Sequence, residues 1–304
     1  MDKTSEPALL EIVVVTSTGA RNHVHACLRS LEQNPISAGE MVVHVVDNAS
    51  TDGTAEMIRG EFPWVHLIEL DWNAGFCIGN NVAVREATAP YVLLLNPDTE
   101  VYAGALDHMI EVMESDPAIG MSSCRLARPD GSFDHAAKRA FPSPLGALAE
   151  FVGVGRNARP GTLLGRLADY RAHELGEYES GEVDAVNGAY MLCRRTAIEQ
   201  VGLLDQQYWL YMEDLDWCYR FKQHGWKVWY DGRVTVMHVK GGTTKVKRHR
   251  GLRHNVAFHR GMGRFYRKFY GGRRPVLDLA VYLGLGAKFA VALARSTAAR
   301  RRLT

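Results

Sequence analysis

The chain has 304 residues, a formal net charge of +2 and 46% hydrophobic residues. This length accommodates one large α/β domain with additions or two small domains, and the hydrophobic content is sufficient for a sizeable core. A charge so close to neutral gives no indication of a nucleic-acid partner. The five cysteines are scattered without a Cys-x-x-Cys pair, which argues against a zinc site and a disulfide framework and fits a reducing cytoplasm. Residues 1–7 do not have the pattern of a signal peptide.

The first 126 residues alternate between short apolar runs and helical segments. Apolar runs, many of them β-branched, predict strands at residues 12–15, 41–46, 65–70 and 91–95. Helices are predicted at 22–33, capped by Asn22, and at 54–60, 79–87 and 104–115. Strand–helix units at this short spacing predict an α/β fold, with a doubly wound, mostly parallel sheet covered by helices on both faces.

The second half of the chain is less regular. Residues 128–181 are rich in Gly, Pro, Arg and Ala and give no clear pattern. Beyond them, strands are predicted at 189–193, 228–230 and 234–237, and helices at 213–224 and 252–270. The predicted organisation is a domain of residues 1–245, with a nucleotide-binding half (1–126) and a smaller acceptor and catalytic half (127–245), followed by a C-terminal helical extension (246–304).

Polar residues follow each of the four N-terminal strands. They lie at 16–18, 47–48, 71–73 and 96–98. The carboxyl ends of parallel strands line the ligand crevice of an open α/β sheet. A single polar loop would mean little, but four on one edge, several with acids, predict a ligand site.

Two of these loops suit a nucleotide. Asp47 can accept a hydrogen bond from a base or ribose, although Asp52-Gly53-Thr54 beyond it is also typical of an ordinary turn and helix start. Asn73 and Gly75 precede a predicted helix, where free N–H groups favour phosphate and a glycine allows close approach of the backbone. Neither a Walker A sequence nor a Gly-x-Gly-x-x-Gly fingerprint is present there.

The apolar strand at 91–95 ends at Asn96-Pro97-Asp98. A departing nucleotide diphosphate carries charge that Mg²⁺ or Mn²⁺ can neutralise by bridging a carboxylate and the phosphate oxygens. Asp98 is the candidate ligand, with a turn cap as its alternative role. His238 follows a second-half strand and could complete a Mn²⁺ shell, although a lone histidine is more often structural.

Residues 209–217, Trp-Leu-Tyr-Met-Glu-Asp-Leu-Asp-Trp, form the densest cluster of acids and aromatics in the chain. At a helix start, free N–H groups favour an exposed carboxylate at Asp214. That carboxylate can act as a general base for a sugar hydroxyl. Glu213 points about 100° away on a helix, so one acid of the two faces the reacting atom. Asp216 and Arg220 are spaced to form an ion pair.

The C-terminal segment is first basic and then apolar. Residues 239–274 contain 12 Lys and Arg and no acid, which suits phosphates or an anionic membrane surface. Residues 276–294 are apolar apart from Asp278 and Lys288, and arginines follow. The two charges argue against a membrane-spanning helix. An interfacial helix and a helix packed on the protein itself or on a partner subunit, as in a homodimer, remain open.

Six motifs in this order resemble the inverting GT-A glycosyltransferases of family 2, and most of all the rhamnosyltransferase-type enzymes of bacterial cell-envelope polysaccharides. The motifs lie at 45–54, 73–76, 95–99, 186–189, 213–216 and 238–241. The resemblance implies roles for individual residues. These are nucleobase recognition by Asp47 beside Thr16, divalent metal binding by Asp98 and His238, base catalysis by Asp214, and a sugar and acceptor region around Gly188.

Two departures from the family pattern matter. Asn96 stands where the first acid of an Asp-x-Asp motif would be, so charge compensation for the metal rests on Asp98 and the phosphates. Ser17-Thr18 replace a Tyr-Asn pair, so a tyrosine that could stack on the base is absent there. The Gln-x-x-Arg-Trp motif and multiple membrane helices of processive synthases are also absent, which predicts transfer of one sugar per encounter.

The resemblance implies transfer from dTDP-rhamnose, with a UDP-hexose as the alternative donor. The acceptor would be a glycan or a polyprenyl-diphosphate-linked sugar, reached in the cytoplasm or peripherally at the inner face of the plasma membrane. A sugar-1-phosphate nucleotidylyltransferase would need a Gly-rich, basic loop after the first strand, where this chain has only Gly19 and Arg21. A nucleotide-sugar-binding module without catalysis would not need to retain Glu213 and Asp214.

Overall fold

The computed structural model describes residues 7–142, 175–239 and 252–301. Its centre is a nine-stranded mixed sheet with one strand, β8 (Ser180–Glu182), paired beside β11. The other strands follow one another across the sheet in the order β3 (His66–Leu70), β2 (Met41–Asn48), β1 (Leu10–Thr16), β4 (Tyr91–Leu95), β10 (Tyr190–Arg194), β6 (Ile119–Ala127), β11 (Lys227–His238) and β5 (Thr99–Glu100). A separate antiparallel pair joins β7 (Lys138–Arg139) to β9 (Ala185–Val186).

The strands of the first half run parallel, as their spacing predicts. β1 pairs in parallel with β2 and β4, and β2 with β3. β10 enters antiparallel between β4 and β6, whereas β11 lies parallel to β6. The prediction of a mostly parallel α/β sheet is therefore confirmed.

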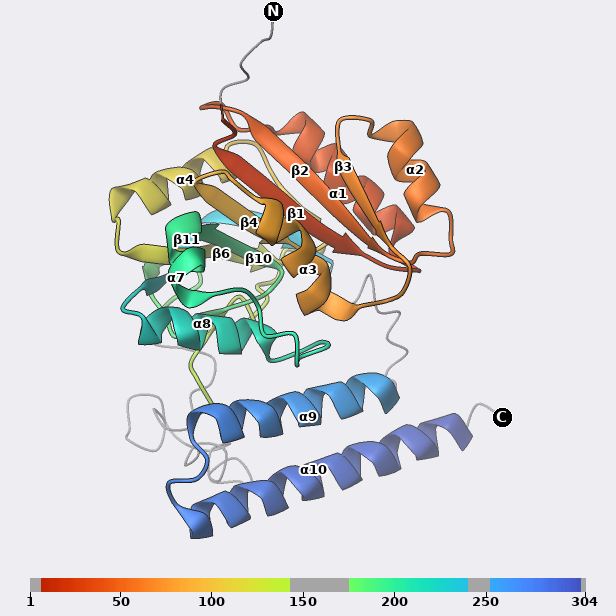
Figure 1. Ribbon diagram of the computed structural model, residues 1–304, viewed down its shortest axis with the longest axis vertical. Helices are drawn as coiled ribbons and strands as arrows, with labels where there is room; N and C mark the ends of the chain where they lie inside the picture. The colour runs from red at the N-terminus through yellow and green to blue at the C-terminus, as the bar shows by residue number, and fades with distance from the viewer. Residues whose placement is uncertain (1–6, 143–174, 240–251, 302–304) are drawn as a thin grey trace, which may run out of the picture.

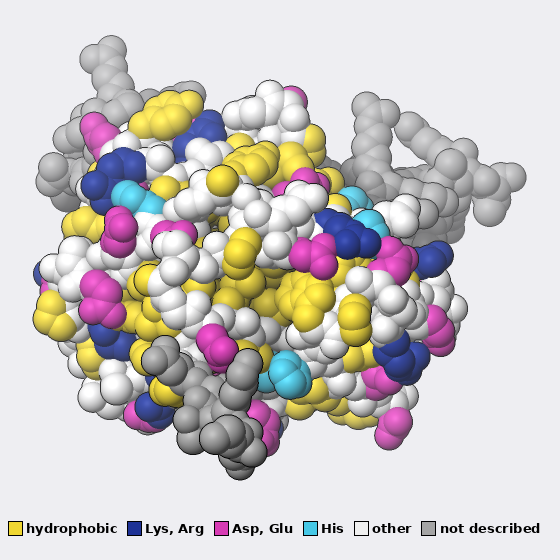
Figure 2. Space-filling model, turned by 90° about the horizontal axis from the view of Figure 1, so that it is seen from above, with side chains coloured by type: hydrophobic (Ala, Val, Ile, Leu, Met, Phe, Trp, Pro, Cys, Tyr) yellow, Lys and Arg dark blue, Asp and Glu magenta, His cyan; other side chains and the backbone are white. Residues whose placement is uncertain are grey.

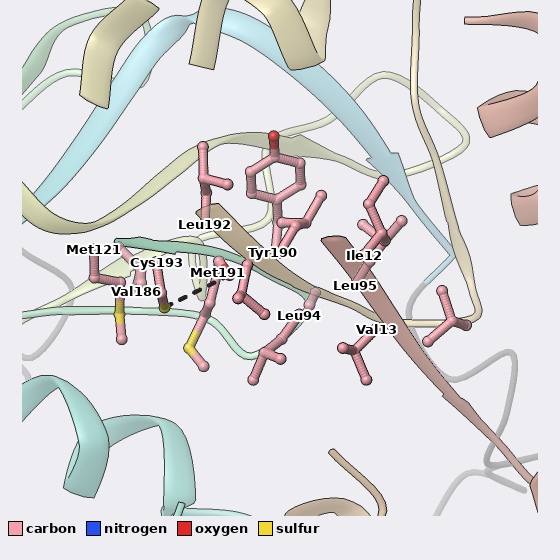
Figure 3. Packing of buried hydrophobic residues seen from close by; sticks show 14 of the residues in the cluster. Ile12, Val13, Leu94, Leu95, Met121, Val186, Tyr190, Met191, Leu192 and Cys193 are labelled. Carbon is pink, nitrogen blue, oxygen red and sulfur yellow. Dashed lines mark hydrogen bonds between the residues drawn. The ribbon is translucent and has the colours of Figure 1, made fainter. Parts of the chain in front are cut away.

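Within the described residues, six helices pack around this sheet (Figure 1). They are α1 (Arg21–Gln33), α2 (Thr54–Glu61), α3 (Gly75–Glu86), α4 (Ala105–Ser115), α7 (Arg195–Val201) and α8 (Glu213–Gln223). Tyr190 and Leu192 of β10 project to one side of the sheet and Met191 to the other, as Figure 3 shows. Because helices and loops cover both sides, β4 is buried along its whole length, which explains its continuous apolar sequence.

Several predicted boundaries are wrong. Asn22 lies inside α1, whose N-cap position is occupied by Ala20 without a side-chain cap. α3 begins at Gly75, one turn before the predicted start. The two short strands predicted at 228–230 and 234–237 are one strand, β11, with an irregularity between Asp231 and Thr235.

One central strand, β6, was not predicted from the sequence. Its sequence, Ile-Gly-Met-Ser-Ser-Cys-Arg-Leu-Ala, shows neither an apolar run nor a strict alternation, yet every residue is buried. Ser122 pairs with β10 on one side of β6 and with β11 on the other, and Ser123 pairs with β11. Hydrogen bonds to the neighbouring strands satisfy the backbone N–H and C=O groups of these serines. The serines are buried because these strands flank them, not because of their own side chains.

The C-terminal helices α9 (Leu252–Phe269) and α10 (Pro275–Arg301) form a hairpin in which α9 lies between the main body and α10 (Figure 1). α9 packs through Phe265, which is buried and lies 5.8 Å, centroid to centroid, from the ring of Tyr219 on α8. Residues Pro275–Ala294 of α10 are long and apolar enough, by length and composition, to cross a membrane. Leu279 and Leu283 are exposed, so packing of this helix on the protein's own surface does not account for its apolar side chains.

Candidate active site

The ends of β1 and β2 bring Thr16 and Asp47 side by side, in register as neighbours. Both side chains are buried. The Asp47 carboxylate accepts hydrogen bonds from the backbone N–H and the hydroxyl of Ser50, the former at 2.9 Å. The Thr16 hydroxyl has no hydrogen-bond partner among the described residues. A ligand at this strand edge would therefore meet a fixed carboxylate beside a hydroxyl that still needs a partner.

The loop at 73–75 is tied to the end of β2 by Asn48. Its Oδ1 accepts the N–H of Ala74 at 3.2 Å, and its Nδ2 donates to the carbonyl of Gly75 at 3.3 Å. Gly75 has φ +84°, and a Cβ there would lie 2.4 Å from Cδ1 of Trp209. A glycine is required by both conformation and space.

The first turn of α3 is less open to phosphate than the sequence suggests. The N–H of Phe76 donates to the carbonyl of Trp209 at 3.0 Å. The N–H of Gly75 donates to Oδ1 of Asn73 at 3.1 Å. Because these amides already have partners, the predicted phosphate contact at this helix start would have to displace them.

Asp98 and His238, predicted as metal ligands from distant parts of the chain, lie together. β11 pairs antiparallel with β5, which places His238 opposite Thr99. Nε2 of His238 lies 3.4 Å from Oδ1 of Asp98, and both side chains are buried. That oxygen has no hydrogen-bond partner among the described residues. The turn at Asn96-Pro97-Asp98 and the end of β11 thus form one polar centre.

Asp134, which the sequence did not single out, lies on the other side of the same imidazole. Its Oδ2 is 3.5 Å from Nδ1 of His238, and the residue is buried. Burial opposes charging of the imidazole, but the carboxylates of Asp134 and Asp98 outweigh it and raise the pKa of His238 to about 9. The Asp134 carboxylate behind the ring fixes its orientation, and a divalent ion at Nε2 would have to replace the proton there.

Asp98 and His238 are spaced to bind one divalent ion, but they would supply only two of its ligands. Ligand atoms about 2.1 Å from one ion lie about 3.0–3.4 Å from each other, which matches the separation of 3.4 Å. Among the residues that the structure describes, no group of three or more His, Cys, Asp or Glu could hold a metal ion. The remaining ligands would therefore come from phosphate oxygens and water.

Asp214 lies at the start of α8 as predicted, but it is buried, not exposed. Its Oδ2 accepts a bond from Nη2 of Arg139 at 2.5 Å and lies 3.3 Å from the backbone nitrogen of Gly188. Its Oδ1 accepts the N–H of Leu215 at 2.8 Å. The carboxylate is therefore stabilised by a guanidinium from β7 in addition to the free amides of the helix start.

Glu213 is buried beside Asp214, and its Oε2 has no hydrogen-bond partner among the described residues. Burial, and then the charge of Asp214, raise the pKa of Glu213 to about 8. The two residues before it, Tyr211 and Met212, have φ of 71° and 75°. Left-handed conformations at two bulky residues are strained and typical of functional loops.

Two hydrogen bonds from backbone amides connect the polar centre of Asp98 and His238 to the acid pair of Glu213 and Asp214. The N–H of Asn96 donates to the carbonyl of Ala189 at 3.0 Å. Ala189 follows Gly188, whose amide lies beside the Asp214 carboxylate. Asn96 and Gly188 thus link the neighbourhood of Asp98 to Asp214 through two contacts.

Asp216 is structural, as its spacing indicates. It pairs with Arg220 at 2.8 Å and also with Lys268 of α9 at 2.7 Å. Arg139 and Asp134 were missed because they lie in the stretch 128–181, which has no regular pattern. The available clue was chemical, since a buried carboxylate requires a cation or several donors. Residues 240–251, part of the basic segment that suits phosphates or an anionic membrane surface, lie outside the described residues.

Comparison with known proteins identifies the family. Residues 12–201 match the model described as Glycosyl transferase family 2. The chain is 29% identical over 251 residues to an N-acetylglucosaminyl-diphospho-decaprenol L-rhamnosyltransferase of Mycobacterium tuberculosis, covering 78% of each chain. It is 27% identical over 185 residues to the rhamnosyltransferase WbbL of Escherichia coli, covering 57% of this chain and 65% of the relative.

Solved structures agree on the fold. The mannosyltransferase PcManGT from Pyrobaculum calidifontis, in complex with GDP-Man and Mn²⁺, superposes with a TM-score of 0.58 at 18% identity, covering 98% of this chain and 79% of the other. GalNAc-T7 with UDP, GalNAc and Mn²⁺ superposes with a TM-score of 0.61 at 12% identity, covering 89% of this chain and 49% of the other. With its sheet, its strand-end acids and a family match over more than half its length, the chain belongs to glycosyltransferase family 2.

Proposed function

We propose that this glycosyltransferase moves one sugar, with inversion, from a nucleotide diphosphate donor to a hydroxyl of a cell-envelope glycan precursor. The observation that carries the proposal is the connected site. The Asp98 and His238 pair lies 3.4 Å apart, and the bond from Asn96 to Ala189 joins it to the Gly188 and Asp214 contact. The residues proposed to act on the leaving group, Asp98 and His238, are thereby connected to Asp214, the residue proposed to activate the nucleophile.

The step is a single displacement. The acceptor hydroxyl oxygen bonds to the anomeric carbon as the bond from that carbon to the diphosphate breaks. Asp214 takes the hydroxyl proton, and the nucleoside diphosphate leaves. Asp98 and His238 would hold Mg²⁺ or Mn²⁺, which neutralises charge on the departing diphosphate.

The proposed donor is dTDP-rhamnose, and a UDP-hexose is the second candidate. Two relatives are rhamnosyltransferases by name, which supports the first. A thermal-shift panel of dTDP, UDP and GDP, with their sugars and with or without Mn²⁺, tests it, because stabilisation follows ligand affinity. If a UDP-hexose raised the Tm more than dTDP-rhamnose did, the UDP-hexose would be the donor and dTDP-rhamnose would be rejected.

The proposed acceptor is a polyprenyl-diphosphate-linked sugar at the cytoplasmic face of the membrane. The relative from M. tuberculosis acts, by its name, on a decaprenol diphosphate. In this chain Val276, Leu279 and Leu283 of α10 are 85%, 61% and 65% exposed. Arg273 and Arg274, just before α10, are exposed as well. An apolar helix face with arginines at its start suits the interface of an anionic bilayer.

The role of Asp214 as base is tested by Asp214→Asn. We expect kcat to fall at least about 10²-fold, since general base catalysis contributes about 10²–10⁴. Asp116→Asn, which alters an acid paired with Lys227 on the surface, is the control and should transfer sugar normally. Near-normal transfer by Asp214→Asn would exclude it as the base.

A further inference from the structure

Arg139 is buried beneath the acid pair and is fixed there by the small sheet of β7 and β9. In that sheet Arg139 is in register with Ala185. Its Nη2 donates to the carbonyl of Val186 at 2.6 Å and to Oδ2 of Asp214 at 2.5 Å. A backbone carbonyl and a strand pairing therefore hold the guanidinium in place before any substrate arrives.

Glu213 and Asp214 are adjacent acids in a buried environment, where two negative charges together would be costly. Arg139 contacts Asp214, whereas Oε2 of Glu213 has no hydrogen-bond partner among the described residues. The Asp214 carboxylate is thus paired with a cation, Arg139. The Glu213 carboxyl is buried without such a partner in the described part of the chain, which favours its neutral form.

The other charges around this pair are already balanced. Asp216, on the same helix, pairs with Arg220 and with Lys268 of α9. Two thiols also face the acids, Cys77 from α3 and Cys218 from α8, and burial raises the pKa of each well above its ordinary value. Both thiols are neutral at physiological pH, so they do not compete with Arg139.

We propose that Arg139 is a positioning residue that keeps the negative charge of the acid pair on Asp214, beside Gly188, and the proton on Glu213. This inference rests on the assignment of Asp214 as the base. Arg139 thereby decides which of two neighbouring acids accepts the proton of the acceptor hydroxyl. Its bond to Oδ2 also fixes the orientation of that carboxylate.

Arg139 can control where the charge lies because Glu213 and Asp214 ionise one after the other. Burial, then the charge of Asp214, raise the pKa of Glu213 to about 8, and Arg139 opposes that rise. An opposite charge within about 4–6 Å lowers a carboxyl pKa by about 1–3 units. Removing the guanidinium therefore raises the pH at which the pair first ionises.

Carboxyl ¹³C NMR of aspartate-labelled protein measures this directly. The resonance that is missing in Asp214→Asn belongs to Asp214. We expect its titration midpoint to rise by about 1–3 pH units in Arg139→Gln and to return most of the way in Arg139→Lys. An unchanged midpoint in a folded Arg139→Gln protein would overturn the proposal.

The pH profile of donor turnover gives the second readout. In Arg139→Gln we expect the acid limb of kcat/KM to move to higher pH by about the same amount, with KM for the donor little changed. Arg125→Gln is the matched control, because Arg125 is also buried and pairs with another acid, the partly exposed Glu177, at 2.8 Å. The acid limb of the kcat/KM profile of Arg125→Gln should stay at the pH of the wild type, even if the Tm of this variant is lower.

The outcomes separate the two proposals. If Arg139→Gln lost activity equally at all pH values and the acid limb of kcat/KM did not move, Arg139 would have only a structural role. That result would overturn the inference. A raised NMR midpoint together with normal transfer by Asp214→Asn would support the charge assignment while removing Asp214 as the base.

Discussion

Several polar atoms in the site are buried without a hydrogen bond within the described part of the chain, although Oδ1 of Asp98 forms an ion pair with His238 at 3.4 Å. The Thr16 hydroxyl, Oδ1 of Asp98 and Oε2 of Glu213 have no hydrogen bond among the described residues. An unpaired buried polar atom costs about 1–3 kcal/mol. That cost is expected where a substrate or ion supplies the missing partner. These three atoms come from three different segments that meet at one edge of the sheet.

Glu213→Gln should stabilise the fold increasingly as pH rises. The folded protein raises the pKa of Glu213 from its ordinary value of 4.5 to about 8. Between these values the unfolded chain ionises and the folded chain does not, so the native carboxyl loses stability as pH rises. The difference in Tm between variant and wild type should grow from pH 4.5 to pH 8. A constant difference would show that Glu213 titrates normally.

Gly75→Ala should destabilise the protein by about 1–3 kcal/mol, the usual cost of a strained backbone. The new Cβ would require φ of +84° and would meet Trp209 at 2.4 Å. Gly60→Ala in α2 is the control, since a Cβ there meets nothing within 4 Å. That control should be neutral or slightly stabilising. Urea unfolding of both variants measures the difference.

Helix α9 contacts the segment that directly precedes Glu213. A Cβ on Gly261 would lie 2.9 Å from the carbonyl oxygen of Tyr211 and 3.1 Å from Cγ of Met212. The rings of Phe258 and His254 also pack near Tyr211. The left-handed residues that precede Glu213 are therefore held from outside by α9, which helps to maintain their strained conformation.

Gly261→Ala should loosen this contact without unfolding the sheet. We expect faster amide exchange in residues 209–216 and a lower kcat, because the acid pair loses its fixed position. Gly263→Ala on the same helix meets nothing within 4 Å and provides the control. If exchange in the loop is the same in both variants, α9 does not support the loop.

The whole molecule has two contrasting faces. Acidic and basic side chains are interspersed on the face opposite the hairpin (Figure 2). On the hairpin side, Leu279 and Leu283 are exposed along α10. Because α9 lies between α10 and the body (Figure 1), a membrane reached by α10 would lie on the same side of the molecule as the loop that α9 contacts. That arrangement suits an acceptor whose sugar is linked to a lipid.

Vesicle flotation tests this orientation. The protein should bind vesicles containing anionic lipid more strongly than zwitterionic ones, and less strongly at high salt. The double variant Leu279→Ser and Leu283→Ser should lose most binding, while Trp72→Ser, which changes an exposed aromatic on the body, should not. Loss of a dimer in light scattering with unchanged flotation would instead assign α10 to a second copy of the chain.

The sequence by itself determined the parallel half of the fold and predicted most of the residues proposed for the site. Apolar runs determine β1, β2 and β4, because strands buried on both faces need them. Motif order placed Asp98, Gly188, Asp214 and His238 in one site, and the distances agree for the pairs that touch. The division of the chain at 126 and 245 and the role of each site residue remain predictions.

The tertiary structure alone decided which groups surround these residues. β6 carries no strand pattern and is buried only because β10 and β11 flank it. Arg139 and Asp134 acquire their roles from contacts across 75 and about 100 positions of sequence, and local pattern contains no information about such pairs. For the same reason Asp214 was expected at the surface. Propensity and periodicity describe neighbours along the chain, whereas burial and charge pairing are fixed by neighbours in space.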